Sequence, residues 1–169
     1  MEPLKLIQTT HSAHETLELG ERLGRLLKGG ETICLMGELG TGKTCLVQGI
    51  VKGMGIHSET ATSPTFTLHH QYRGRISLHH LDLYRLQQPD ELETLGLLDL
   101  MEDPESVLVI EWAEKAAGLL PKSRLEIQIR WQKENSRVFE IHAVGEHYRD
   151  LIKELQATAP HSDHRSLQI

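Results

Sequence analysis

The sequence predicts an α/β fold with a mostly parallel central sheet, and three observations lead to this prediction. Residues 37–44 read GELGTGKT and match the G-x-x-x-x-G-K-[ST] pattern in full. A short, mostly apolar run at 32–36 precedes this pattern, and apolar residues at helical spacing follow it at 45–52. The apolar run VLVI at 107–110 is typical of a parallel strand that is buried on both faces. Strand, glycine loop and helix in this order favour a P-loop NTPase-type three-layer sandwich.

The first third of the chain predicts a strand and a helix ahead of the glycine loop. Residues 4–7 are an apolar run of strand length. Residues 12–15 have the S-x-x-E form of a capping box, and leucines at helical spacing follow from 19 to 27. Gly29-Gly30 ends this helix before the strand at 32–36. The helix after the loop is expected to end near residues 53–55.

The middle third adds antiparallel strands to the predicted sheet. Extended runs at 65–72 and 76–81 are joined by a hairpin-length turn centred on Gly74, so we expect an antiparallel ribbon that interrupts the parallel sheet. Residues 89–93 read PDELE, which is typical of a helix start with acids in its first turn. The buried strand at 107–110 follows that helical region.

The last third predicts a helix, two strands and a final helix. A short helix is expected at 113–119, strands at 124–131 and 137–144, and a helix at 148–156. The 169 residues fit one compact domain, which we assign to residues 1–156. Residues 157–169 are expected to form a disordered C-terminal tail.

Composition excludes several classes of function. The formal net charge of −6 argues against a broad basic surface, so the chain is not expected to bind a nucleic-acid backbone by itself. No apolar stretch approaches membrane-spanning length and the first residues do not form a signal peptide, which predicts a cytoplasmic protein without a membrane partner. Cys34 and Cys45 are expected to be small buried side chains. The histidine pairs 69–70 and 79–80 lie on predicted strands, where neighbouring side chains point to opposite faces. No Cys/His spacing of the zinc-binding kind is present, so a structural zinc site is not expected.

The glycine loop is predicted to bind a nucleoside triphosphate. Its glycines let successive N–H groups turn toward one anion, and the N-terminus of the following helix adds partial positive charge. Lys43 is expected to reach the β- and γ-phosphates with a stem outside the core, and the Thr44 hydroxyl to hold Mg²⁺. The predicted nucleotide-binding residues of the loop are Gly37, Glu38, Leu39, Gly40, Thr41, Gly42, Lys43 and Thr44.

A second acid is needed to complete such a metal site, at the end of a strand beside the loop strand. Glu111 ends the most apolar run in the chain, which is the best candidate for a central strand. Asp82 ends a run that alternates more and is expected nearer an edge. We therefore rank Glu111 first for the metal, directly or through water, and expect Asp82 to help place the attacking water or a group that supports the direct ligands of the ion.

Four sequence blocks together resemble one bacterial family. They are the loop at 37–44, TSPTFTL at 62–68, HLDLYRL at 80–86 and IEWAE at 110–114. In this order, within about residues 4 to 143, they resemble the TsaE (YjeE-like) ATPase family. That family takes part in making threonylcarbamoyladenosine at position 37 of tRNAs that read ANN codons. The glycine loop alone is widespread, whereas the other three blocks in this order are specific.

The resemblance implies a P-loop sheet with helices on both sides, binding of ATP and Mg²⁺, and slow ATP hydrolysis by the isolated chain. It also implies stimulation by TsaB and TsaD homologues, which transfer the threonylcarbamoyl group, so that this chain would reset their complex and meet tRNA only through it. By position, Lys43 and Thr44 match the phosphate and Mg²⁺ residues, and Glu111 matches the second metal residue.

Three further residues take roles from the same resemblance. Thr65 lies in the block that matches the family's switch-like loop, Asp82 matches a functionally required acid, and Trp112 matches a tryptophan needed for activity. We expect Trp112 to leave its strand by the face opposite Glu111 and to serve the partner interface, although burial in the core is the alternative. Ala113 stands where many relatives carry proline, so the local turn is expected to differ.

Two other functions use the same loop. A small-molecule kinase would need an acceptor pocket and usually a basic lid, and no arginine-rich lid segment is present. A GTP-driven switch would need a guanine-reading [NT]-K-x-D motif, which does not occur. No arginine is obviously placed as an internal finger, a group that is worth ~10³–10⁵ in rate, so a slow ATPase completed by a partner is the favoured prediction. Arg73, Arg75 and Arg85 could serve instead, although exposed arginines in turns are more often only solvated.

Overall fold

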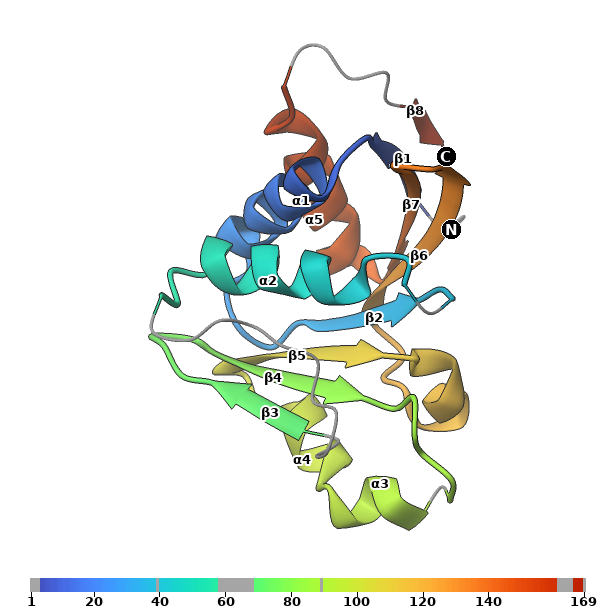
Figure 1. Cartoon of the computed structure of the whole chain (residues 1–169). Helices are drawn as coiled ribbons and strands as arrows, with labels where there is room; N and C mark the ends of the chain where they lie inside the picture. Colours follow the sequence, from blue (N-terminus) through green and yellow to red (C-terminus); the bar gives the residue numbers. More distant parts are fainter. Residues whose placement is uncertain (1–3, 39, 58–68, 89, 161–165, 169) are drawn as a thin grey trace.

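The computed structural model describes residues 4–38, 40–57, 69–88, 90–160 and 166–168, and it contains one eight-stranded sheet flanked by helices (Figure 1). The strand order is β3-β4-β5-β2-β6-β7-β1-β8. The strands are β1 (Leu4–Thr10), β2 (Thr32–Met36), β3 (His69–Tyr72), β4 (Ser77–Asp82), β5 (Ser106–Glu111), β6 (Arg124–Lys133), β7 (Ser136–Val144) and β8 (Ser166–Gln168). The helices are α1 (Ala13–Leu26), α2 (Lys43–Gly53), α3 (Asp90–Thr94), α4 (Leu97–Glu102), the 3₁₀ helix η1 (Ala113–Leu119) and α5 (Glu146–Ala157).

The centre of the sheet is parallel, as the sequence predicts. The pairs β4–β5, β5–β2 and β2–β6 are parallel, and β3, β7, β1 and β8 join them through antiparallel pairs. β5 lies directly beside the loop strand β2, and Leu35 is in register with Glu111. The predicted order of elements is therefore confirmed through α5.

The hairpin of β3 and β4 differs from its predicted place. β4 pairs with β5 in parallel, and only β3, at the edge of the sheet, is antiparallel to it. The hairpin therefore extends the parallel sheet and does not interrupt it. Residues 65–68, which the sequence predicts to be part of the first strand of this ribbon, lie outside the described residues.

Alternation along the central strands builds two separate clusters of buried side chains. On β5, Val107 and Val109 face α1, α2 and α5, whereas Leu108 and Ile110 face α3, α4 and η1. We call these the first and the second cluster. The first includes Leu19, Leu23, Ile33, Leu35, Leu46, Ile50, Phe139, Leu151 and Leu155, and the second includes Cys34, Leu81, Leu83, Leu92, Leu97, Ala113 and Ala116.

Glycines allow α1 and α2 to pack with their backbones in close approach. A Cβ atom built on Gly20 of α1 would lie 2.5 Å from the Leu46 carbonyl oxygen, and one on Gly49 of α2 would lie 2.3 Å from that of Leu17. Both distances are shorter than any normal contact with backbone, so larger residues would push the helices apart. This contact holds α2, and with it the glycine loop, in a fixed position on the sheet.

The end of the chain differs from the prediction of a disordered tail. Helix α5 ends at Ala157, and Ser166–Gln168 form β8, which is antiparallel to β1 with Lys5 opposite Gln168. The prediction of disorder is therefore wrong for residues 166–168, because β1 is an edge that accepts another strand.

Within the described residues, no helix has both the length and the apolar character needed to cross a membrane.

Candidate nucleotide-binding site

The glycine loop connects β2 to α2 by backbone conformations that favour glycine. Gly37, Gly40 and Gly42 have φ values of 150°, 79° and 104°, which side-chain-bearing residues rarely adopt. Gly42 is the N-cap of α2 and has no side chain to accept from the first-turn N–H groups. The first turn of α2 therefore has the arrangement that binds an anion at a helix N-terminus. Leu39 lies outside the described residues.

Lys43 begins α2 and folds its side chain back over the loop. Its Nζ donates to the carbonyl oxygens of Gly37, at 2.5 Å, and Glu38, at 2.9 Å. The residue is only 5% exposed, so the expectation of a stem outside the buried interior is wrong. Burial lowers the pKa of the Lys43 ammonium, and the carboxylates of Glu111, Glu114 and Asp82 act in the opposite direction. The loop thus holds one cation among several acids.

Glu111 lies at the end of β5 on the face that α2 covers. Its Oε1 accepts a long hydrogen bond, 3.5 Å, from the Thr44 hydroxyl of α2. Its Oε2 lies 2.5 Å from Nε2 of His80, and both of these side chains are buried. Glu111 is therefore held between a helix residue and a strand residue, and it is brought next to Thr44 as the sequence predicts for a shared metal ion.

Asp82 ends β4, one strand farther from the loop strand than Glu111. The two acids are in register across the parallel β4–β5 pair, and Asp82 Oδ1 accepts from the Tyr84 N–H at 3.0 Å. Asp82 also contributes to the field at Lys43. The predicted residues Lys43, Thr44, Asp82 and Glu111 therefore gather at the carboxyl ends of β2, β4 and β5, whereas Thr65 lies outside the described residues.

Trp112 directly follows Glu111 and turns the chain sharply into η1. Among the described non-glycine residues only Trp112 has a positive φ, 59°, and it serves as the N-cap of η1. Its half-buried ring packs against the second cluster, away from the face of Glu111, as expected. The Lys43 ammonium lies 4.2 Å from the ring centroid, and the Tyr84 ring lies 5.1 Å away. Trp112 thus joins the second cluster to the glycine loop by a cation–π contact.

His80 is a site residue that the sequence reasoning missed. The pattern correctly separates His79 and His80 onto opposite faces, but it does not say which neighbour each one meets. The parallel register places His80 opposite Val109, on the same face as Glu111. The sequence signal that would have found it is the alignment of HLD at 80–82 with VIE at 109–111 as adjacent parallel strands.

A hollow of about 310 Å³ lies beside the loop. Its walls are Met36, Gly37, Glu38, Trp112, Glu114 and Gln128. Lys115 borders the same region, because its Nζ donates to the Tyr84 carbonyl and lies 5.6 Å from the Tyr84 ring centroid. The end of the sheet therefore offers a concave surface that includes the start of the loop, the acids Glu38 and Glu114 and the Trp112 ring.

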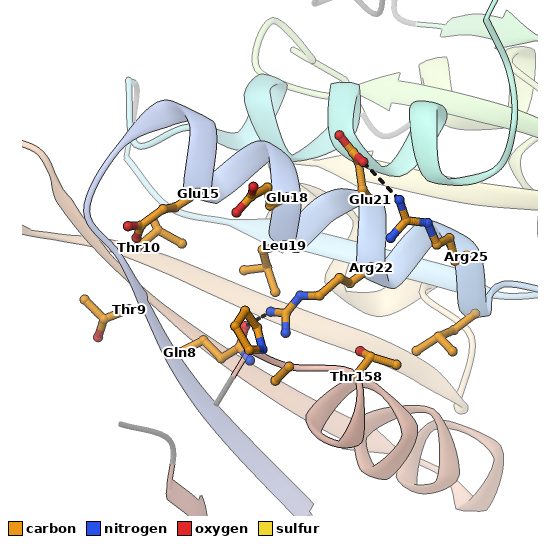
Figure 2. Close-up of a pocket in the computed structure, with 13 residues that line it drawn as sticks. Gln8, Thr9, Thr10, Glu15, Glu18, Leu19, Glu21, Arg22, Arg25 and Thr158 are labelled. Atoms are coloured by element: carbon orange, nitrogen blue, oxygen red, sulfur yellow. Dashed lines mark hydrogen bonds and ion pairs between the residues drawn. The ribbon is translucent and has the colours of Figure 1, made fainter. Parts of the chain in front are cut away.

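A larger cavity, of about 630 Å³, shares no residue with the loop (Figure 2). It lies between the end of β1, α1 and residues 158–160. Charged side chains on its wall are paired within the protein: Arg22 donates to Gln8 at 2.9 Å, and Arg25 to Glu21 at 3.2 Å. The chemistry that the sequence predicts is therefore not at this larger cavity.

Comparison with known proteins agrees with the geometry. Residues 10–139 match the family model described as "Threonylcarbamoyl adenosine biosynthesis protein TsaE". Proteins named tRNA threonylcarbamoyladenosine biosynthesis protein TsaE share 40% identity over 128 residues in Treponema pallidum (76% of this chain, 93% of that protein) and 43% over 141 residues in a Nostoc species (81% and 85%). The Bacillus subtilis protein of that name shares 35% over 147 residues (86% and 90%).

A solved structure shares the fold over nearly the whole chain. The crystal structure of Bacillus subtilis YdiB superposes with a TM-score of 0.77 and 29% sequence identity, covering 94% of this chain and 98% of that one. The family match includes the glycine loop, Asp82, Glu111 and Trp112, which the fold brings together at one end of the sheet. The chain therefore belongs to the TsaE family of tRNA threonylcarbamoyladenosine biosynthesis proteins.

Proposed function

We propose that the chain binds ATP with Mg²⁺ and hydrolyses it slowly, and that this hydrolysis supports a complex of TsaB and TsaD homologues that forms N6-threonylcarbamoyladenosine at adenosine 37 of tRNA. The observation that carries the proposal is the meeting of Lys43, Thr44 and Glu111 at the first turn of α2. The chain would meet tRNA only through its partners, in keeping with its net charge of −6.

The residues present fit a magnesium nucleotide. The N-cap glycine of α2 leaves the first-turn N–H groups for a phosphate, and Lys43 can exchange the two loop carbonyls for β- and γ-phosphate oxygens. The hydroxyl of Thr44 and the carboxylate of Glu111 are oxygen ligands of the kind Mg²⁺ prefers. When bound, the ion would neutralise charge that develops on the phosphates.

His80 and Asp82 would support this arrangement in different ways. The buried His80 ring fixes one oxygen of Glu111, which leaves the other oxygen directed toward Thr44. Asp82 sits one strand away, where it would orient the attacking water or a water bound to the ion. Both act from rigid strand ends, so their positions would not depend on closure of a loop.

The described residues also favour slow hydrolysis by the isolated chain. The described contacts to the glycine loop and to Glu111 involve no arginine. A finger arginine contributes about 10³–10⁵ in rate to related enzymes. We therefore expect the TsaB–TsaD pair to supply or organise the missing stabilisation of the transition state.

The test is ATP turnover by the purified chain with and without TsaB and TsaD homologues, together with matched acid variants. Glu111→Ala is expected to weaken Mg²⁺-dependent ATP binding more than Asp82→Ala does, because Glu111 contacts Thr44 directly. Affinity is measured with Mg²⁺ and with EDTA for each variant. Loss of the Mg²⁺ dependence in Asp82→Ala with its retention in Glu111→Ala would reverse the two roles, and no stimulation by the pair would contradict the partner assignment.

A further inference from the structure

A shallow apolar groove lies on the outer side of the second cluster. It has a volume of about 260 Å³ and is lined by side chains of α3, α4 and the end of η1. Leu92 and Leu97 are buried and form its floor. Leu98 and Leu119 stand on its walls and are 61% and 41% exposed. Two large aliphatic side chains thus meet solvent at one place.

Exposed apolar side chains of this size are concentrated on this side of the molecule. Among the described residues, the exposed large hydrophobic residues are Tyr84, Leu98, Leu119 and Trp131. Tyr84 contacts Trp112 of the second cluster, and Leu98 and Leu119 line the groove. Only Trp131 lies elsewhere, on β6, where the Arg137 guanidinium covers its ring at 3.6 Å. Scattered exposed leucines are ordinary, but a groove with two of them is typical of a binding surface.

The chain around the groove is strongly acidic. Residues 90–105 contain seven of the chain's 24 acidic residues and no lysine, arginine or histidine, whereas the other 17 acids are matched by 18 lysines and arginines. This segment therefore accounts for the whole negative net charge of −6. Within the part of the chain that the structure describes, no ion pair joins these acids to a basic side chain. Glu93 and Asp99 lie on the groove wall itself.

We propose that this groove is a docking surface for a protein partner that presents a basic surface with a protruding aliphatic or aromatic side chain. The apolar side chain fills the space between Leu98 and Leu119, and the basic groups meet Glu93, Asp99 and the neighbouring acids. A second copy of this chain does not suit the groove, because its own groove region is acidic. Under the function proposed above, on which this identification rests, the partner is the TsaB–TsaD pair.

The position of the groove gives docking a direct route to the nucleotide site. Leu119 ends η1, and η1 begins at the residue after Trp112, whose ring contacts Lys43. Ala113 and Ala116 of η1 are buried in the second cluster with Leu92 and Leu97. A partner seated on the groove therefore touches the same packed unit that supports Trp112 and the end of β5.

The test measures binding of the intact chain to the TsaB–TsaD pair in the presence of ATP and Mg²⁺. Leu98→Glu is expected to weaken binding at least about tenfold, as for an anchor residue of an interface. Asp99→Lys is expected to weaken it as well and to reduce its salt dependence. The matched controls are Trp131→Glu, an exposed large hydrophobic residue elsewhere, and Glu134→Lys, an exposed acid in the β6–β7 turn. Both controls should bind like the wild type.

The outcomes separate this inference from the proposed function. Melting temperature and basal ATP hydrolysis are measured for each variant, and both should stay close to wild type because Leu98 and Asp99 are exposed. If the wild-type chain binds the pair and the Leu98→Glu and Asp99→Lys variants bind it equally well, the docking surface is overturned while the partner assignment stands. Absence of wild-type binding would overturn the partner assignment and the docking surface together. Self-association of the chain that Leu98→Glu abolishes would identify a second copy as the occupant and would also overturn the inference.

Discussion

The two faces of the sheet are built on the same central strands but are covered in different ways. The first face lies under α1, α2 and α5, helices of 11 to 14 residues that pack closely on one another and on the sheet. The second face lies under α3, α4 and η1, which have five to seven residues each. Its surface carries exposed leucines and an acidic segment, whereas the buried glycine contact of α1 and α2 belongs to the first face.

The two faces are therefore expected to contribute differently to the stability of the fold. Long helices with a wide apolar face bury more surface than short ones, so the first face is expected to supply most of the stability. Short helices are stable only through their tertiary contacts, so the second face is expected to contribute less stability. This face also carries Trp112, which has a positive φ, and the exposed Leu98. The candidate nucleotide site lies where the two faces meet, because Glu111 faces α2 and Trp112 packs against the second cluster.

The largest expected effect is loss of nucleotide binding in Lys43→Ala. Lys43 is the cation that the loop holds against the expected phosphate position, and two charge-assisted hydrogen bonds are worth about 100-fold or more in affinity. The fold should be retained, because burial already disfavours this ammonium group, as its lowered pKa indicates. Titration with a fluorescent ATP analogue and thermal melting check both points. Near-normal affinity would contradict the assignment of the loop.

The second largest effect is a loss of stability in Gly49→Ala on the first face. The added Cβ would meet the Leu17 carbonyl at 2.3 Å, and such overpacking costs about 1–3 kcal/mol, or about 2–12 °C in Tm for a chain of this length. Gly118→Ala is the matched control on the second face, where an added Cβ meets no atom within 4 Å. Equal Tm values for the two variants would mean that the faces do not differ as described.

A smaller effect on stability is expected for Trp112→Ala, with a selective loss of function. A fully buried tryptophan would cost about 3–5 kcal/mol, and the half-buried Trp112 should cost less. Its cation–π contact with Lys43 is worth about 0.5–1 kcal/mol, so ATP affinity should change only slightly. We expect stimulation of turnover by the TsaB–TsaD pair to be lost. Trp131→Ala, at the other tryptophan, is the control and should keep this stimulation. A large Tm shift in Trp112→Ala with stimulation retained would assign Trp112 to the core.

The smallest expected effect concerns the thiol of Cys34, which faces the second cluster. Burial raises the pKa of Cys34 to about 12, with Arg124 acting in the opposite direction, so the reactive thiolate is scarce at neutral pH. Burial also raises the pKa of Cys45. Iodoacetamide at pH 8 should therefore leave Cys34 unmodified in the native chain and label it after denaturation, as mass spectrometry would show. Rapid native labelling would show that the second face opens readily, which would sharpen the contrast with the first.

Most elements and the members of the site could be predicted because their signals are local. The glycine loop, the capping box at 12–15 and the apolar run at 107–110 each specify their own backbone, and the structure confirms all three as elements. The sequence ranks Glu111 above Asp82 because the run that Glu111 ends is the more apolar one. The structure places that run, β5, directly beside the loop strand β2.

The errors came from contacts between distant parts of the chain. The place of the β3–β4 hairpin and the pairing of β8 with β1 depend on which strands of the sheet have an unpaired edge. A local sequence pattern does not predict which edges these are. The burial of Lys43 depends on the loop carbonyls and on Trp112, which lies far along the sequence. The bond between His80 and Glu111 depends on the register of β4 against β5.

The sequence by itself determined that this protein has a glycine loop of the P-loop pattern between a strand and a helix, two candidate metal acids and a TsaE-like order of motifs, because neighbouring residues specify each of them. Only the tertiary structure decided that His80 holds Glu111, that Trp112 covers Lys43, and that Leu98 and Leu119 meet beside an acidic segment. Strand register and helix packing set these contacts, and both arise from the balance of burial over the whole chain rather than from any one segment.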